Sequence, residues 1–394
     1  MAAPVQSAII TAQERYSSLP WPTATDEEWR RTDPSLIPVP SSGLEPPASP
    51  GLKVGWETPP SSALPPGVIL TDLMTAAEQH PQLIEQYLYK SGTPEGLKKF
   101  VALHQALATQ GLFCYVPDGV RVEFPLKSWM ELTQSGGAVF PHVLLFAGRE
   151  SELTLIDERY SAGDGETPVL SDEMVEIFLK KGANLRYVHL QRWNPAVTEL
   201  FTQRAVLEQD AQFLNITIGL GGCLTKATVE TVLQESGARS ELLGILLGSN
   251  RQHFDFHTLQ DHRAERTFSD LLYKSALADQ AESIYTGLIR ITKQAQKSDA
   301  YQANRNLLLS EGAKADSIPM LEIETNDVRC THGVAVGPVD EDQLFYLMSR
   351  GLPHAEAERL IVEGFFDQVF KRIPMESLRE ELAVEVNRRL IRHG

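Results

Sequence analysis

Alternating apolar and polar residues dominate the middle of the chain and predict β-strands there. From about Leu112 onward, segments of roughly 5 to 8 residues place apolar side chains at every second position, as strands with one buried face do. The stretches that contain such segments include LFCYVPDGVRVEFPL, VLLFAGRESELTLIDERY, ANLRYVHLQRW, AQFLNITIGLGG and QHFDFHTLQ. Most of them have no convincing amphipathic helix between them, which argues against repeated β-α-β units.

A weak repeat narrows the choice of β architecture. The small residues Ala183, Ala211 and Ala238 each precede a strand-like segment, at spacings of roughly 27 residues, as stacked β-coils produce. Two architectures remain, a β-sandwich and a parallel β-helix. The repeat and the scarcity of Asn-Gly and Asp-Gly hairpin turns favour the parallel β-helix.

Helical periodicity flanks this β-rich segment on both sides. Helical patterns cover residues 5–37, 71–90, 93–111, 340–351, 353–373 and 375–390. Thr93 can cap the third of these patterns and Gly111 can end it, while Asp340 and Gly351 play the same parts in the fourth. The sequence therefore predicts a mainly β protein with helical flanks.

A proline-rich arm divides the N-terminal region. Residues 38–66 contain nine prolines with several Ser and Gly residues, which predicts an extended segment without regular structure. We expect three parts: an N-terminal helical region over residues 1–111 that includes this arm, a β-helix core over 112–337, and a C-terminal helical domain over 338–394.

Composition and charge exclude several classes of partner. Apolar residues make up 42% and charged residues 22% of the chain, and no apolar run approaches the roughly 20 residues that a membrane span requires. The formal net charge of -16 argues against nucleic acid, because phosphate binding requires clustered Lys and Arg. The N-terminus lacks the pattern of a secretory signal, and three scattered cysteines form no disulfide framework. We therefore expect a cytoplasmic protein with no membrane partner.

The segment CTHGVAVG contains the strongest candidate for chemistry. In a strand, Cys330 and His332 would point to the same face, where a thiolate and an imidazole can reach one soft metal or one cluster. Zinc and iron–sulfur sites usually have four ligands, so a partner surface would have to complete the site. The alternative is a buried cysteine beside a hydrogen-bonded histidine.

Other candidate sites are weaker. His253, Asp255 and His257 would share one strand face and could bind a metal, but such a row is more often the solvated face of a strand. The glycines of GLGG at 219–222 fit a strand-terminating turn better than a phosphate site. The Walker, GxSxG and HExxH motifs are absent from the sequence, so we expect a protein that is not an enzyme.

Aromatic residues are unusually frequent in the C-terminal helices. Phe345 and Tyr346 form one pair and Phe365 and Phe366 another. Packing on the β-domain explains many such residues, but two pairs exceed what a small helical cap usually needs. Part of this surface is therefore a candidate for docking a partner protein.

The segment LEIETNDVRCTHGVAVGPVDEDQLFYLMSRGLPHAEAERLIVEGFF resembles the SufB/SufD family of iron–sulfur cluster assembly proteins. Upstream, similar stretches include AQKSDAYQANRNLLLSEGAKADSIP, TLQDHRAERTFSDLLYKSAL and FVALHQALATQGLFCYVPDGVRVEFPL. The resemblance covers most of the chain and favours the SufD branch, because SufB proteins are longer and richer in cysteine.

This resemblance implies a right-handed parallel β-helix and a scaffold role without catalysis. It implies a heterodimer with a SufB-like subunit, with Cys330 and His332 facing that subunit at a site for a transient iron–sulfur cluster. It also implies a SufC-like ATPase bound through the C-terminal helices, for which we expect Phe345, Tyr346, Arg350, Phe365 and Phe366 to form the surface. A flavin on the complex stays open and none is expected on this chain.

Three alternatives stay open at this point. A SufB-like main scaffold would accept sulfur itself and would need Cys114 and Cys223 to be accessible. A β-helix polysaccharide lyase would need a clear acidic ladder for calcium, which the sequence does not show. An exposed β-helix edge also makes a homodimer a candidate assembly of the isolated chain.

Overall fold

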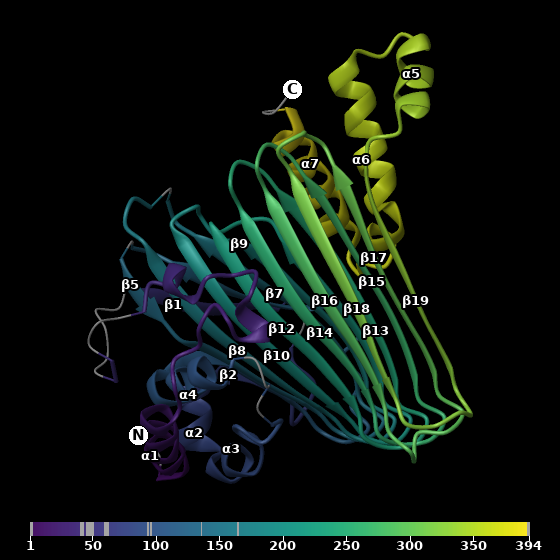
Figure 1. The fold of residues 1–394 in the computed structure, drawn as a ribbon. Helices are drawn as coiled ribbons and strands as arrows, with labels where there is room; N and C mark the ends of the chain where they lie inside the picture. The colour runs from purple at the N-terminus through teal and green to yellow at the C-terminus, as the bar shows by residue number, and fades with distance from the viewer. Residues whose placement is uncertain are drawn as a thin grey trace.

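A parallel β-solenoid forms the centre of the molecule (Figure 1). The computed structural model describes residues 3–39, 43–44, 51–58, 63–92, 94, 97–134, 136–163 and 165–391. Within these ranges the chain winds through about eight turns, and each turn adds one strand to each of two facing sheets, called sheet A and sheet B here. The predicted fold class is thus confirmed, and the sandwich is excluded because the successive strands of each sheet pair in parallel.

The strands of each sheet follow one another in space as their turns follow in sequence. Sheet A contains, in spatial order, β1 (Leu52–Glu57), β4 (Leu126–Leu132), β7 (Glu152–Ser161), β9 (Asn184–Arg192), β11 (Gln212–Gly219), β13 (Arg239–Gly248), β15 (Phe268–Leu277), β17 (Asp299–Leu308) and β19 (Arg329–Pro338). Sheet B contains β2 (Ile69–Asp72), β3 (Gln110–Val116), β6 (Pro141–Ala147), β8 (Val169–Leu179), β10 (Val197–Leu207), β12 (Leu224–Leu233), β14 (His253–His262), β16 (Glu282–Ile291) and β18 (Lys314–Ile323), while β5 (Gly137–Val139) pairs with β8.

The weak sequence repeat corresponds to the corners of the solenoid. Ala183, Ala211 and Ala238 stand directly before β9, β11 and β13, and each is fully buried. The residue before each alanine has a positive φ, 56° at Asp210 for example, which turns the chain sharply into the next strand. One left-handed residue followed by one small buried residue explains the repeat.

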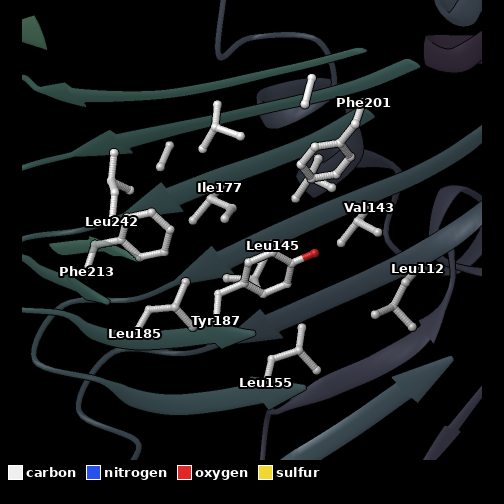
Figure 2. Packing of buried hydrophobic residues seen from close by; sticks show 14 of the residues in the cluster. Leu112, Val143, Leu145, Leu155, Ile177, Leu185, Tyr187, Phe201, Phe213 and Leu242 are labelled. Atoms are coloured by element: carbon white, nitrogen blue, oxygen red, sulfur yellow. The ribbon is translucent and has the colours of Figure 1, made fainter. Parts of the chain in front are cut away.

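The core lies between the two sheets. Side chains such as Leu145 and Ile177 from sheet B meet Leu185 and Leu242 from sheet A (Figure 2). Burial of each such side chain contributes about 1.5–3 kcal/mol relative to its exposure to water. Because every turn adds further apolar pairs to the same column, the core runs continuously from turn to turn.

The N-terminal helices differ from the prediction in extent. They are α1 (Ala3–Ser18), two short 3-10 helices (Glu27–Trp29 and Pro34–Leu36), α2 (Leu73–Gln79), α3 (Pro81–Tyr87) and α4 (Lys98–Leu107). The single helix predicted over 5–37 is wrong beyond Ser18, because Pro20 and Pro22 cannot donate the next helical hydrogen bonds. The pattern over 71–90 likewise divides at His80, since Pro81 follows it.

Two further predictions in this region fail or go untested. Gly111 does not end a helix but lies in β3, where a Cβ atom would collide with the carbonyl oxygen of His142. The predicted cap Thr93 lies outside the described residues.

The proline-rich arm is not irregular throughout. Its segment LKVGWE, which is free of proline, forms β1 and pairs antiparallel with β4. Leu52 and Val54 pack against the core from this strand, so alternation prevails locally over the surrounding prolines.

Three C-terminal helices follow β19, as the sequence predicted: α5 (Glu341–Ser349), α6 (His354–Phe370) and α7 (Glu376–Ile391). The Asp340 carboxylate caps α5 by accepting hydrogen bonds from the backbone N–H groups of Asp342 and Gln343 at 2.9 and 3.0 Å. Helices α6 and α7 cover the outer face of sheet A, whereas α5 stands away from the sheets (Figure 1). None of the helices in the described ranges has the length and apolar character of a membrane span.

Phe366 anchors this helical layer. Its side chain is 0% exposed and packs with Val362 and Val369 against the outer face of sheet A, while the Phe345 side chain on α5 is 73% exposed. We expect Phe366→Ala to lower the free energy of unfolding by about 3–5 kcal/mol, because it leaves a cavity. The matched exposed variant Phe345→Ala should change it by less than about 0.5 kcal/mol. Denaturant titration followed by circular dichroism measures both, and equal losses would contradict this packing.

Candidate functional site

The last turn of the solenoid, formed by β18 and β19, leaves apolar side chains in the open. Leu321 and Ile323 of β18 pair with Ile289 and Ile291 of β16, so each pair shares one inner-face column. The two β16 residues are 0% exposed, whereas Leu321 and Ile323 are 38% and 40% exposed. The inner face of the terminal turn therefore has the composition of a core without a following turn to cover it.

The backbone of the terminal turn also presents an edge. In the ladder between β17 and β19, Arg329 donates its N–H to the Ser298 carbonyl at 3.0 Å. In a parallel pair, alternate residues direct both backbone groups to one neighbour, so the N–H groups of Cys330, His332, Val334 and Val336 point away from β17. On β18, the N–H groups that point away from β16 form a similar row, but Pro319 interrupts this row because it has no N–H group. The longer uninterrupted edge is therefore that of β19.

Cys330 and His332 lie on this edge with their side chains on the inner face. Cys330 pairs with Ala300 and His332 with Gln302, and both of these β17 residues are buried inside the solenoid. Cys330 is half-buried and contacts the apolar cluster around Ile289 and Ala300, while His332 is exposed. The structure thus brings the two residues to one face, at the open end of the solenoid.

The surroundings of Cys330 disfavour the thiolate form of its side chain. Burial, and after it the nearby Asp299 carboxylate, raises the pKa of the thiol above its ordinary value. Metal binding requires the thiolate, so a metal or cluster arriving here would displace the proton.

The other two cysteines belong to earlier turns. Cys114 in β3 is fully buried, and burial followed by the Asp157 charge raises the pKa of its thiol to about 12. Cys223 precedes β12 and is exposed. Neither adds a third ligand beside Cys330, and burial keeps Cys114 from accepting sulfur at the surface.

The predicted docking residues of the C-terminal helices do not all share one surface. Phe345 and Tyr346 are exposed on α5, and the Arg350 guanidinium lies 5.1 Å from the Tyr346 ring centre. Phe365 is partly buried, and Lys274 donates to its carbonyl oxygen at 2.6 Å. Phe366 does not belong to the predicted docking surface, because its side chain is buried between α6 and sheet A.

A groove opens between α5 and α6 beside the end of β19. Its volume is about 830 Å³, and Tyr346, Leu347, Leu360 and Phe365 contribute its apolar lining. Asp340 and Asp342 also line the groove and add negative charge to it. A partner with an apolar ridge flanked by basic residues fits these features.

The row His253, Asp255 and His257 joins the N-terminal segment to the outer face of sheet B. Asp255 accepts from Lys226 Nζ at 2.6 Å and from the Thr32 hydroxyl at 2.5 Å. His257 lies 2.9 Å from Asp255 and 3.0 Å from Glu28. Lys226 Nζ also donates to the backbone carbonyl of Glu28 at 2.7 Å. These bonds tie residues 28–32 to sheet B, and we call the cluster the clamp.

The clamp favours the charged forms of Glu28, Asp255 and His257. Burial opposes the charge on Asp255, but hydrogen bonding to His257 and the Lys226 charge lower its pKa. The pKa of Glu28 is lowered mainly by its hydrogen bond to His257. Burial lowers the pKa of His257, but its hydrogen bonds to Asp255 and Glu28 outweigh burial and raise it.

A second charged cluster lies inside the solenoid and has no counterpart among the predicted sites. The Arg159 guanidinium donates to Asp157 at 2.6 and 2.8 Å and to Glu173 at 2.5–3.0 Å, and all three residues are fully buried. Burial raises the pKa of Glu173 to about 7 and lowers that of His189 to about 3. Asp157, Glu173 and His189 are near enough together to hold a metal, but the guanidinium occupies the space between the carboxylates.

The GLGG segment is a turn, as predicted. β11 ends at Gly219, and the chain passes through Gly221 and Gly222 before β12. A Cβ atom on Gly221 would meet the Trp193 carbonyl at 2.1 Å, so glycine is required there by close packing of the backbone.

Comparison with known proteins places these features in a family context. Residues 130–365 match the family model described as "SUF system FeS cluster assembly, SufBD core domain", and residues 55–127 match the "SufBD protein N-terminal region". The iron–sulfur cluster assembly protein SufD of Bacillus subtilis is 32% identical over 82% of this chain and 74% of its own length. SufB of the same organism is 32% identical over 82% of this chain and 68% of its own length. A SufBD family protein of Staphylococcus saprophyticus is 30% identical over the same shares.

The clamp predicts a pH dependence of stability with a defined sign. The raised pKa of His257 means that its stabilisation is complete below about pH 6.5 and is lost as the pH rises through the folded-state pKa. The lowered pKa values of Glu28 and Asp255 mean that the stabilisation from these two carboxylates is lost as the pH falls below about 4. We expect His257→Gln to cost about 1.5–3 kcal/mol near pH 6.

Urea titrations from pH 4 to 9 measure this dependence in the wild type and in His257→Gln. The variant should show a weaker decline of the unfolding free energy above pH 6.5. Parallel curves for the two proteins over that range would contradict the assignment of His257 to the clamp.

Proposed function

The chain belongs to the SufB/SufD family of iron–sulfur cluster assembly proteins, and from this premise we propose that it is a scaffold subunit of a SUF assembly complex. In this proposal it pairs with a SufB-like subunit through the open end of the solenoid. It contributes Cys330 and His332 to a shared site for the nascent cluster, and it binds a SufC-like ATPase through α5 and α6. ATP hydrolysis belongs to that ATPase.

The exposed terminal turn is the observation that carries the proposal. Its inner face combines the Cys330 thiol and the His332 imidazole with three exposed apolar side chains, those of Leu321, Ile323 and Val334. Such an edge invites strand pairing with another chain, and a second solenoid end would supply both the missing backbone partners and the missing ligands. Two donors from each side satisfy the usual four of an iron–sulfur site.

The separate groove between α5 and α6 supports the second contact. It adjoins the end of β19, so a protein bound there would sit next to the turn that carries Cys330 and His332. Movement of a bound ATPase would then have to reach the cluster site along β19, from Pro338 at its end to His332 near its start, which is about 20 Å of strand.

The cluster site is tested in the complex of this chain with SufB-like and SufC-like partners. We expect Cys330→Ala and His332→Ala each to reduce bound iron and sulfide while leaving the complex intact. Changes to groups around a metal typically cost about 10–100-fold in affinity, so loss of a direct ligand should cost at least that. Iron and sulfide assays on anaerobically purified complex give the result.

The matched control is Cys223→Ala, which removes an exposed thiol outside the terminal turn. Its complex should bind iron and sulfide as the wild type does. If Cys223→Ala lowers the bound iron and sulfide and Cys330→Ala does not, the result would instead favour a main scaffold that accepts sulfur through Cys223. Unchanged loading in both terminal-turn variants would leave only a packing role for CTHGVAVG.

The ATPase contact is tested with the double variant Phe345→Ala and Tyr346→Ala. Exposed aromatic anchors of an interface cost about 2 kcal/mol or more when truncated, so binding of the SufC-like ATPase should weaken at least tenfold in calorimetric titration. Val384→Ala is the control, because Val384 is equally apolar and exposed but lies on α7. Equal affinity of all three proteins would place the ATPase contact elsewhere.

A further inference from the structure

The amide of Gln302 is incompletely satisfied although it is buried. Gln302 lies on β17 with 2% of its surface exposed, and its Nε2 donates to the Gly287 carbonyl across the solenoid at 3.1 Å. Within the described part of the chain, its Oε1 has neither a hydrogen-bond partner nor contact with solvent. An acceptor buried in this way costs about 1–3 kcal/mol, which calls for an explanation.

One candidate donor for this oxygen is His332, the residue beside Gln302 on the next strand. Gln302 and His332 are direct partners in the β17–β19 ladder, and both point to the inner face. Side chains in this relation stand about 4.8 Å apart at their backbones, which is within reach of a hydrogen bond between an amide oxygen and an imidazole N–H. Cys330 has only Ala300 beneath it, and Val334 has no donor in its side chain.

The opposite strand leaves room for this amide. A Cβ atom on Gly287 would lie 2.4 Å from Gln302 Oε1 and 2.5 Å from the hydroxyl of Tyr285. Glycine at this position therefore allows the amide to extend across the solenoid. Any larger residue would push it away from that place.

We propose that Gln302 is a positioning residue for His332. Its Oε1 accepts the N–H of one ring nitrogen of His332, and the lone pair of the other ring nitrogen then faces the open end. Ligating histidines commonly have their second nitrogen held by such an acceptor, which fixes the tautomer and the ring orientation. The relevance to a cluster rests on the proposed function, whereas the hydrogen bond itself does not.

The bond is tested first by a high-resolution structure of the intact complex with its SufB-like and SufC-like partners, without iron or sulfide. A partner covering the open end excludes water from His332, so the proposal requires Gln302 Oε1 within about 3.2 Å of a ring nitrogen. A His332 ring turned away from Gln302 there would overturn the proposal, whatever the fate of the cluster site.

The functional consequence is tested with Gln302→Met, which keeps the volume but removes the acceptor. Iron and sulfide retention by the complex should fall about 10–100-fold, as expected for loss of a group that orients a ligand. Gln260→Met is the matched control, because Gln260 is equally buried and its Oε1 is also unpartnered among the described residues, but it pairs with Ile289 instead of His332. Gly287→Ala should reduce retention as well, by displacing the amide.

A double-mutant cycle separates positioning from mere packing. If Gln302 acts through His332, adding Gln302→Met to His332→Ala produces no further loss of retention. Additive losses would show a structural role and overturn the proposal. If His332→Ala alone has no effect on retention, the proposed cluster site fails, and the structure of the unloaded complex still decides whether Gln302 holds His332.

Discussion

The parallel ladder imposes the constraint on which the rest of this structure depends. Each turn of the solenoid satisfies its backbone groups and buries its inner face only by contact with the turns on either side. At the N-terminal end the chain meets this constraint itself, since β1 and β2 add antiparallel strands to the two sheets. At the other end, β18 and β19 have no such cover among the described residues. The two ends thus differ in physical character, and the uncovered end contains Cys330 and His332.

Much of the fold was predictable because the ladder leaves a periodic trace in the sequence. Alternation of period two marks the strands, and the small residues at Ala183, Ala211 and Ala238 mark the corners. One error arose where a local sequence preference conflicted with a tertiary contact. Prolines around LKVGWE suggested an irregular arm, but pairing with β4 is worth more than their local effect. The helix predicted over 5–37 failed for the opposite reason, since Pro20 and Pro22 should have ended it.

The candidate site was predictable in its residues but not in its surroundings. Spacing alone put Cys330 and His332 on one face, whereas the exposure of that face depends on which turn is last. Phe365 and Phe366 are neighbours on one helix, so at most one of them can point directly at sheet A. The sequence does not show which face of the helix meets the sheet, and the structure shows that Phe366 is the buried one. Gln302 gave no signal at all, because a single glutamine in an alternating strand has the appearance of a solvated residue.

The buried charges show how polar residues are tolerated inside such a solenoid. Strict alternation along β7 already places Asp157 and Arg159 on the face of Leu153 and Leu155, so their burial follows from the pattern. Burying a charge is costly unless it is paired, and here each carboxylate has the guanidinium beside it. This pairing is not complete everywhere: several buried polar atoms, among them Gln302 Oε1 next to the terminal turn, have no hydrogen-bond partner among the described residues. What distinguishes this end is the combination of that atom with apolar inner-face side chains that are more than a third exposed and with strands β18 and β19 that have no further strand beside them among the described residues.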